Sequence, residues 1–144
     1  MNANRETYNA MKKRHEDEVN AFPYMWAFNK EQFEEGMKRL GLEVTDTNKI
    51  VSIGCGGYLR KSDYGQMLKM HKRLSAELRE AIYGDEKFAY EAFRRELANH
   101  EYVVTYDPEC ALRCLGLTWG DVIGNEMLKR AFKAAEKDYL ASVE

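Results

Sequence analysis

The chain has 144 residues, of which 24 are Asp or Glu and 22 are Lys or Arg, so its formal net charge is −2. This length is typical of one domain, and 44% hydrophobic residues are enough to fill a core, which excludes intrinsic disorder. A charge near zero also excludes the strongly basic surface of a dedicated DNA-binding domain and the acidic surface of a DNA mimic.

Apolar side chains at three- and four-residue steps predict a first helix over residues 8–22, closed by Pro23. The segment YMWAF (24–28) predicts a short strand. Asn29 and Gln32 form the pattern of a capping box, which predicts the start of a second helix.

The segment KIVSI (49–53) predicts a strand, and the glycine-rich turn 54–57 predicts that residues 58–61 return beside it as a hairpin. A long third helix is expected over residues 63–84, where Gly84 ends it.

Asp85 is expected to cap a fourth helix that runs to about Asn99. The segment EYVVTYD (101–107) has the highest β propensity in the chain and is expected to form a central strand. Pro108 predicts the start of a short helix that Gly116 ends. A last helix should bury one face, made of Leu128, Ala131, Phe132, Ala135 and Tyr139.

Together these elements predict an α+β fold in which about five helices pack on a small antiparallel sheet of three or four strands, with segment 101–106 paired to segment 49–53. The chain contains two prolines and no Gly/Ser-rich tract that would mark a linker. We therefore expect a single globular domain over residues 1–144.

The three cysteines, Cys55, Cys110 and Cys114, are an odd number, and the N-terminal segment has no apolar core of a signal peptide. These features predict a reduced, cytoplasmic protein. No apolar run approaches the roughly 18 residues of a membrane span, so no membrane association is expected.

Cys110 and Cys114 stand one helical turn apart and could bind Zn²⁺ if His100 and His15 supplied two further ligands. A second closely spaced ligand pair is missing, and small cysteines that pack in the core explain the same spacing. We therefore expect no metal and no cofactor. A nucleophilic site of Cys55 with a histidine would require hydrogen-bond contact that the sequence does not establish, so no catalytic residue is assigned.

Basic residues follow the glycine-rich turn and are the candidate binding residues. The turn lacks the lysine and helix of a phosphate-binding P-loop, which argues against nucleotide binding. Three of the basic residues, Lys69, Lys72 and Arg73, share one helical face. Such a face is typical of a solvated surface or of a patch for an acidic partner. The set consists of Arg60, Lys61, Lys69, Lys72 and Arg73. No interleaved aromatic residues support base stacking, so nucleic acid is expected only indirectly.

Residues 111–128 have a faint helix-turn-helix pattern. The second half of this segment carries no Arg or Lys that could contact DNA, so it predicts a structural corner capped by Thr118 and Asp121.

Five segments resemble a family of small uncharacterised proteins carried by phages and mobile elements of gut Firmicutes. They are RHEDEVNAFP (14–23), FNKEQFEEGMKRLGL (28–42), IGCGGYLRKSD (53–63), ELANHEYVVTYD (96–107) and ALRCLGLTWGDV (111–122). The resemblance implies a genomic setting in which proteins act on host defence or host regulation, as anti-CRISPR proteins of similar size do. It brings no catalytic residues.

Two hypotheses follow. The first is a non-enzymatic interaction protein that occupies a surface of a host effector, an anti-CRISPR-type inhibitor among the options, since the chain is rich in Tyr and Met, which are common at interfaces. The alternative is a small metal- or histidine-dependent enzyme acting on a phosphate-containing substrate and centred on His100 with His15, Glu101 or the cysteines.

Overall fold

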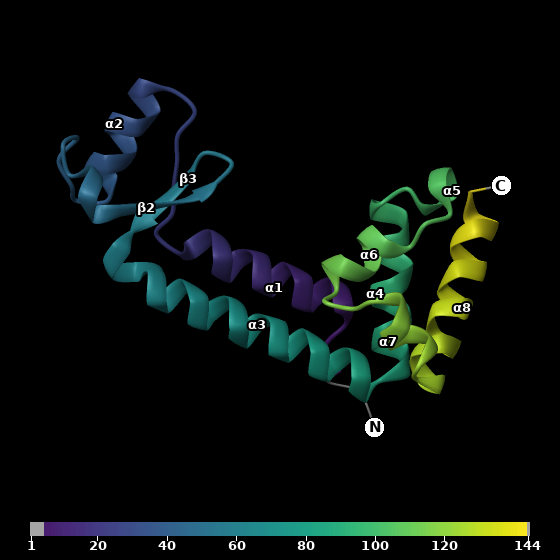
Figure 1. Cartoon of the computed structure of the whole chain (residues 1–144). Helices are drawn as coiled ribbons and strands as arrows, with labels where there is room; N and C mark the ends of the chain where they lie inside the picture. The colour runs from purple at the N-terminus through teal and green to yellow at the C-terminus, as the bar shows by residue number, and fades with distance from the viewer. Residues whose placement is uncertain (1–4, 144) are drawn as a thin grey trace. The chain divides into compact units, whose positions relative to one another are not determined.

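The computed structural model describes residues 5–143, and over these residues the chain has eight α-helices and one three-stranded antiparallel sheet (Figure 1). The predicted α+β class is therefore confirmed. None of the helices in residues 5–143 is both long and apolar enough to cross a membrane. The helices are α1 (Tyr8–Ala21), α2 (Lys30–Arg39), α3 (Tyr64–Gly84), α4 (Glu86–Asn99), α5 (Tyr102–Thr105), α6 (Glu109–Cys114), α7 (Trp119–Ile123) and α8 (Glu126–Ser142), and the strands are β1 (Met25–Trp26), β2 (Ile50–Gly54) and β3 (Gly57–Arg60).

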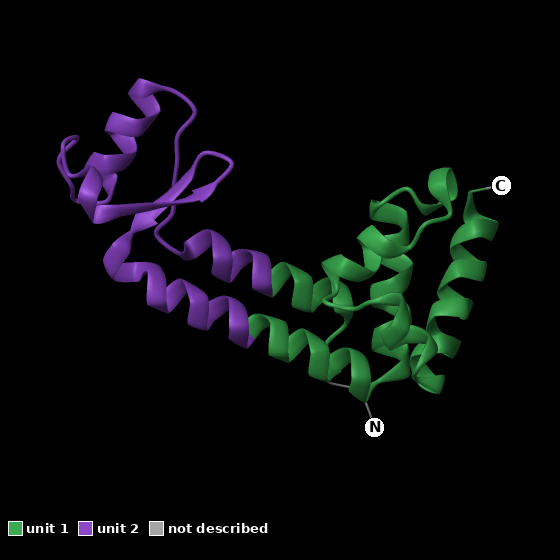
Figure 2. Cartoon of the chain, viewed as in Figure 1, with its two compact units in different colours: residues 1–14, 74–144 green, residues 15–73 purple. Residues whose placement is uncertain are grey.

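The chain divides into two compact units (Figure 2). Within the described residues, the first unit comprises 5–14 and 74–143, and the second unit comprises 15–73. The boundary falls inside α1 and inside α3, so each of these helices contributes residues to both units.

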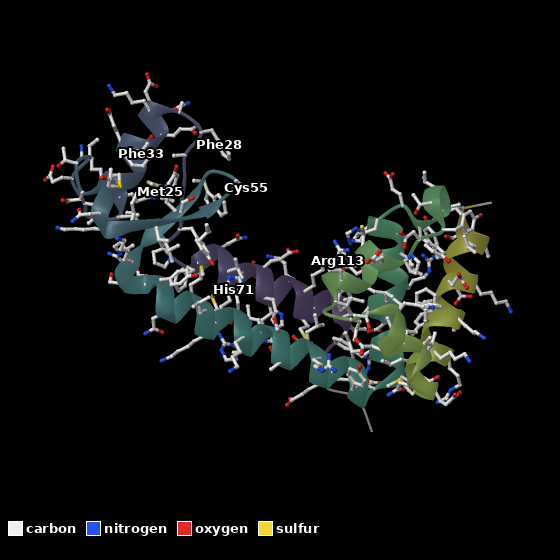
Figure 3. All side chains as sticks on the ribbon, viewed as in Figure 1. Met25, Phe28, Phe33, Cys55, His71 and Arg113 are labelled. Atoms are coloured by element: carbon white, nitrogen blue, oxygen red, sulfur yellow. The ribbon has the colours of Figure 1, made fainter. Side chains whose placement is uncertain are left out.

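The second unit contains the whole sheet, in the order β1-β3-β2. The predicted hairpin of β2 and β3 and the predicted strand at β1 are confirmed. Helix α2 lies close against β1, since a Cβ at Gly36 would stand 2.2 Å from Sδ of Met25. Only glycine permits this approach, and it lets Met25, labelled in Figure 3, share a small core with Met37, Leu40 and Ile50.

Local capping explains where α2 begins and ends. The side chain of Asn29 accepts the N–H of Gln32, and Oε1 of Gln32 accepts the N–H of Phe28 at 2.8 Å. At the other end Gly41 has φ +76°, and the N–H of Leu42 returns to the carbonyl of Met37. The predicted helix start is confirmed.

The first unit is organised around α4, which packs against α8, α6 and α5. Phe93 of α4 meets Phe132 of α8 edge to face, with ring centroids 5.4 Å apart. The predicted inner face of the last helix is confirmed, because Leu128, Ala131, Phe132, Ala135 and Tyr139 are all buried.

The prediction of a central strand over residues 101–107 is wrong. Residues Tyr102–Thr105 form the one-turn helix α5, which pairs with no strand. Glu101 and Tyr106, on either side of it, have φ of +50° and +56°, so both flanking residues are left-handed, a conformation that does not continue a strand. Tyr102 is buried and its hydroxyl donates to Glu136 of α8, and this packing overrides the β propensity of the segment.

A carboxylate of α4 anchors the start of α1. The Glu91 carboxylate accepts a hydrogen bond from Nη2 of Arg5 at 2.8 Å and another from the backbone N–H of Tyr8 at 3.1 Å. Burial acts to raise the pKa of Glu91, but these hydrogen bonds outweigh it and hold the pKa below its ordinary value. The stabilisation from Glu91 is therefore complete above the ordinary pKa of 4.5 and is lost as the pH falls through the lower folded-state value.

We expect Glu91→Gln to lower the free energy of unfolding at pH 7 and to flatten its fall between pH 5 and pH 2, since a glutamine side chain does not titrate. Denaturant melts at several pH values measure both effects. The control is Glu80→Gln, because Glu80 is exposed on α3. An acid dependence as steep in Glu91→Gln as in the wild-type protein would contradict the assignment.

Candidate functional site

Aromatic side chains gather on one side of the extended segment that joins α1 to α2. Phe22, Tyr24, Trp26 and Phe28 alternate along it, and alternate side chains of an extended chain point the same way. Phe22 and Tyr24 have ring centroids 5.2 Å apart, and Tyr24 and Trp26 are 5.8 Å apart. These contacts make a continuous aromatic surface on the second unit.

Two of these rings, Trp26 and Phe28, pack against the glycine-rich turn between β2 and β3. A Cβ at Gly56 would lie 2.5 Å from Cε1 of Phe28, and a Cβ at Gly57 would lie 2.6 Å from Cζ3 of Trp26. The N–H of Ala27 also donates to the carbonyl of Gly56 at 2.8 Å. The glycines are thus required by the aromatic rings that lie against the turn, shown for Phe28 in Figure 3.

The rings at this turn remain open to solvent. Trp26 is 51% exposed, Phe28 is 75% exposed and Ile53, which also lies against Gly57, is 37% exposed. We call Trp26, Phe28 and Ile53 the hairpin patch. Large exposed aromatic clusters of this kind mark interaction surfaces more often than scattered apolar residues do.

A groove of about 390 Å³ adjoins the hairpin patch and shares Trp26 with it. Its lining includes Phe22, Tyr24, Arg39 and Leu40. The patch and groove together offer a concave apolar surface with one basic side chain. Sequence reasoning identified residues 24–28 only as a strand, although the alternation of aromatic residues over 22–28 was the signal of this surface.

All five predicted basic residues lie in the second unit, in different roles. Arg60 is half-buried, because its Nε pairs with Asp63 at 2.7 Å and its Nη1 donates to the carbonyl of Leu40. The guanidinium of Arg73 pairs with Glu18 of α1. The others, Lys61, Lys69 and Lys72, have exposed side chains.

A pocket of about 690 Å³ lies in the first unit beside the left-handed residue Tyr106. Tyr102, Trp119 and Phe132 line it, together with the charged side chain of Lys133. The predicted corner is found at its edge, where Thr118 and Asp121 form a reciprocal capping box at the start of α7, as predicted.

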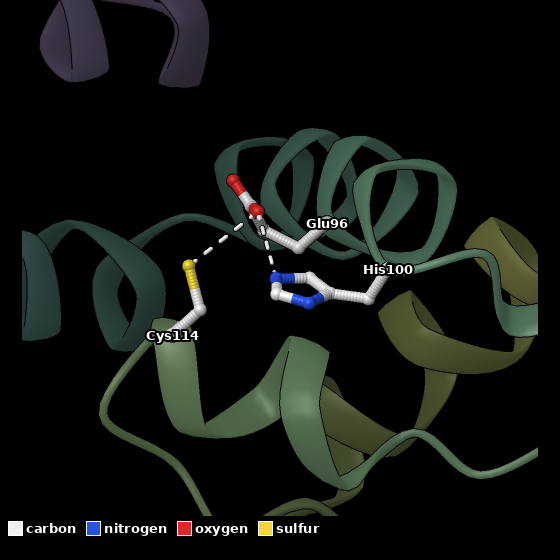
Figure 4. Close-up of side chains that lie close together, drawn as sticks. All are labelled: Glu96, His100 and Cys114. Carbon is white, nitrogen blue, oxygen red and sulfur yellow. Dashed lines mark hydrogen bonds and ion pairs between the residues drawn. The ribbon is translucent and has the colours of Figure 1, made fainter.

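The most buried charged side chain among the described residues belongs to Glu96 of α4, which is 1% exposed. Its Oε2 accepts hydrogen bonds from the Tyr8 hydroxyl and from Nζ of Lys12 at 3.1 Å. Its Oε1 accepts from Nδ2 of Asn99 at 3.2 Å and from Sγ of Cys114 at 3.4 Å. We call this arrangement the Glu96 centre; Figure 4 shows Glu96 and Cys114 of it, together with the neighbouring His100.

Burial and hydrogen bonding act in opposite directions on the Glu96 centre. Burial alone would raise the pKa of Glu96, but hydrogen bonds from Tyr8, Asn99 and Lys12 outweigh it and hold the pKa below its ordinary value. Burial and the neighbouring carboxylate raise the pKa values of Tyr8 and Cys114. The centre therefore holds an ionised carboxylate between a phenol and a thiol that both keep their protons at neutral pH.

The structure brings together only part of the predicted metal set. His100 is the C-cap residue of α4, and its Nε2 lies 3.7 Å from Oε1 of Glu96. The thiol of Cys114 donates a hydrogen bond to the same oxygen. Cys110 and His15 are not in this cluster. The expectation that both cysteines of α6 are buried in the core is wrong, because Cys110 and Cys114 have exposed side chains, even though the Cys114 thiol reaches the buried carboxylate.

Sequence reasoning missed Glu96. It stands one helical turn before His100 on α4, so the spacing placed the two side chains on one face. Nothing in the local sequence shows that Cys114, Tyr8 and Lys12 converge on this carboxylate, because they come from other helices.

Tyr8→Phe should lower the free energy of unfolding by about 1.5 to 3 kcal/mol, since it removes one hydrogen bond to a buried charged group. The control is Tyr90→Phe, which removes an exposed hydrogen bond to Asp138 and should cost less than about 1 kcal/mol. Denaturant melts measure both. Equal losses of unfolding free energy in the two variants would show that the hydrogen bond from Tyr8 to Glu96 contributes no more than an exposed one.

Comparison with known proteins finds one family. A model described as a family of unknown function (DUF7659) matches residues 7–138. This agrees with the resemblance of the sequence to an uncharacterised family. No curated protein matches the chain, and no solved structure matches it.

Proposed function

The chain belongs to the DUF7659 family, and because the description of that family assigns no activity, we propose from the surface of the protein that it is a non-enzymatic interaction protein. It binds a host protein through the hairpin patch. The observation that carries this proposal is the exposure of Trp26 and Phe28 beside an apolar groove. Trp and other aromatic residues supply a large part of the binding energy at many interfaces.

The rings of the hairpin patch are supported on one side by the backbone of the turn, which restricts their conformations before a partner binds. Trp26 and Phe28 lie directly against the backbone of Gly57 and Gly56, and the N–H of Ala27 fixes the segment to the turn. A side chain that already occupies its bound position loses little conformational entropy when a partner covers it. This supports a binding role for the patch.

Basic side chains of the same unit contribute to the approach of an acidic partner. Lys61, Lys69 and Lys72 are exposed and offer their full charge to solvent. Arg60 and Arg73 are engaged in ion pairs within the unit, with Asp63 and Glu18, so they contribute less. Exposed charges around an apolar centre mainly increase the rate of association.

The biological setting of the proposal rests on the resemblance. The resemblance implies an origin in phages or mobile elements of gut Firmicutes, and the odd number of cysteines favours the cytoplasm. In that setting the protein would act as an anti-defence inhibitor of the anti-CRISPR type. The bound host effector would lose access to its own substrate or partner.

The second candidate is the small metal- or histidine-dependent enzyme acting on a phosphate-containing substrate. The convergence of His100 and Cys114 on Glu96 favours it. The cation closest to this cluster, Lys12, is already bound to Glu96 rather than offered to a phosphate group. The interaction hypothesis is therefore the better supported of the two.

We expect the double variant Trp26→Ala, Phe28→Ala to bind the partner at least about 30-fold more weakly, which corresponds to the roughly 2 kcal/mol of an interface hot spot. The full-length protein and the double variant are each immobilised and exposed to a host lysate. The partner is the protein that the wild-type chain retains and the variant does not. Calorimetry with the purified partner then gives the affinity.

Two controls separate this surface from a general loss of structure or from catalysis. Val44→Ala shortens another exposed apolar side chain of the same unit and should leave the affinity unchanged. His100→Ala should also leave it unchanged. A folded double variant that binds with wild-type affinity would exclude the hairpin patch, and a loss of function in folded His100→Ala would favour the enzyme.

Lys69→Glu combined with Lys72→Glu should slow association with an acidic partner, and the difference from the wild-type protein should shrink as salt rises, because screening shortens the range of charge interactions. Arg73 is left intact, since its reversal would also break its pair with Glu18. Lys133→Glu with Lys137→Glu on α8 makes the same change in net charge and is the control. Equal effects of the two pairs would dismiss a specific basic surface.

A further inference from the structure

Three different metal-binding side chains meet in the first unit. The ligand atoms of Glu96, His100 and Cys114 all lie within 4.8 Å of one another. Figure 4 shows the three side chains together. Glu96 lies on α4, His100 is the C-cap residue of that helix, and Cys114 is the last residue of α6. The cluster is thus built from two helices that already pack together in the core of the unit.

The separations are close to those around a tetrahedral metal ion. Metal–ligand bonds of about 2.0 to 2.3 Å at tetrahedral angles put ligand atoms about 3.3 to 3.8 Å apart. Oε1 of Glu96 is 3.4 Å from Sγ of Cys114 and 3.7 Å from Nε2 of His100. The thiol and the imidazole are on exposed residues, so small side-chain rotations can bring them the remaining distance.

The Glu96 side chain is held in place for this role. Tyr8 and Lys12 occupy its Oε2, and Asn99 also donates to Oε1, so the carboxylate cannot turn away from the cluster. Metal ligands in proteins are commonly fixed by such outer hydrogen bonds. The oxygen closest to His100 and Cys114 is Oε1, whereas the ammonium of Lys12 pairs with Oε2.

We propose that Glu96, His100 and Cys114 bind one divalent transition-metal ion of the zinc class, with water in the fourth position. A thiolate and an imidazole favour zinc, cobalt or nickel over magnesium and calcium, which prefer oxygen ligands. On binding, the S–H bond of Cys114 breaks, the sulfur bonds to the metal and the proton leaves to solvent. The thiolate and the carboxylate then supply two anionic ligands, although the carboxylate charge is shared with Lys12 through its other oxygen, and neutral His100 supplies the nitrogen. This site is independent of the proposed interaction function and of the hairpin patch.

The test uses the full-length protein without a histidine tag, treated with a chelator and then titrated with Co²⁺ and with Zn²⁺. We expect one Co²⁺ per chain, with the thiolate-to-cobalt charge-transfer absorption and the strong visible bands of a tetrahedral site. Zn²⁺ should displace the Co²⁺ and remove both signals. Affinity for Zn²⁺ is measured by competition with a colorimetric chelator.

The variants identify the ligands. Cys114→Ser should abolish the charge-transfer band, and His100→Ala should weaken Zn²⁺ binding by at least about tenfold, since even the loss of an outer hydrogen bond commonly costs 10- to 100-fold. Cys110→Ser is the matched control, because Cys110 is an exposed cysteine one turn earlier on the same helix and should leave the spectrum intact. His71→Ala is the corresponding histidine control. Circular dichroism verifies that each variant folds. If Cys114→Ser does not fold, His100→Ala still tests the site, because His100 is exposed.

The outcomes that overturn the proposal are equally specific. Wild-type protein that binds no Co²⁺ would show that the cluster is only a hydrogen-bonded centre of the fold. Loss of the charge-transfer band in Cys110→Ser with retention in Cys114→Ser would place the metal elsewhere. An unchanged Zn²⁺ affinity in folded His100→Ala would remove His100 from the site.

Discussion

The buried carboxylate of Glu96 is the constraint on which the arrangement of the first unit depends. An ionised group that leaves water must be paired and fully hydrogen-bonded, or it destabilises the fold. Here Tyr8 and Lys12 come from α1, Asn99 from α4 and Cys114 from α6, so the requirement of one side chain ties three helices together. The same requirement leaves His100 and Cys114 beside a fixed oxygen, which is how a structural centre also becomes a metal-binding candidate.

The second unit is governed by steric fit. Its glycine-rich turn resembles a phosphate-binding loop in composition, yet Gly56 and Gly57 are there because the rings of Phe28 and Trp26 lie where side chains would otherwise be. Gly36 permits the same close approach of α2 to Met25. The turn backbone supports the rings on one side and solvent lies on the other, so the unit presents an exposed apolar surface. Folding and the proposed binding thus depend on the same contacts.

The segment 101–107 shows how tertiary packing overrides local preference. Val103, Val104 and the tyrosines favour a strand, but a strand requires a partner, and the edges of the small sheet belong to the other unit. Tyr102 is instead buried beside Tyr139 of α8 and reaches Glu136. The burial of a large aromatic ring with a satisfied hydroxyl outweighs a β propensity that spans only about 1 kcal/mol.

The sequence by itself determined what depends on near neighbours. The α+β class, the hairpin, the buried face of α8 and the caps at Asn29, Asp85 and Thr118 all follow from periodicity or from hydrogen bonds within a few residues. Only the tertiary structure decided the helical state of 102–105, the assembly of Trp26 and Phe28 against the turn, and the meeting of Cys114 with Glu96. These features join residues distant in the chain, and their energies come from burial and packing, which no local pattern records.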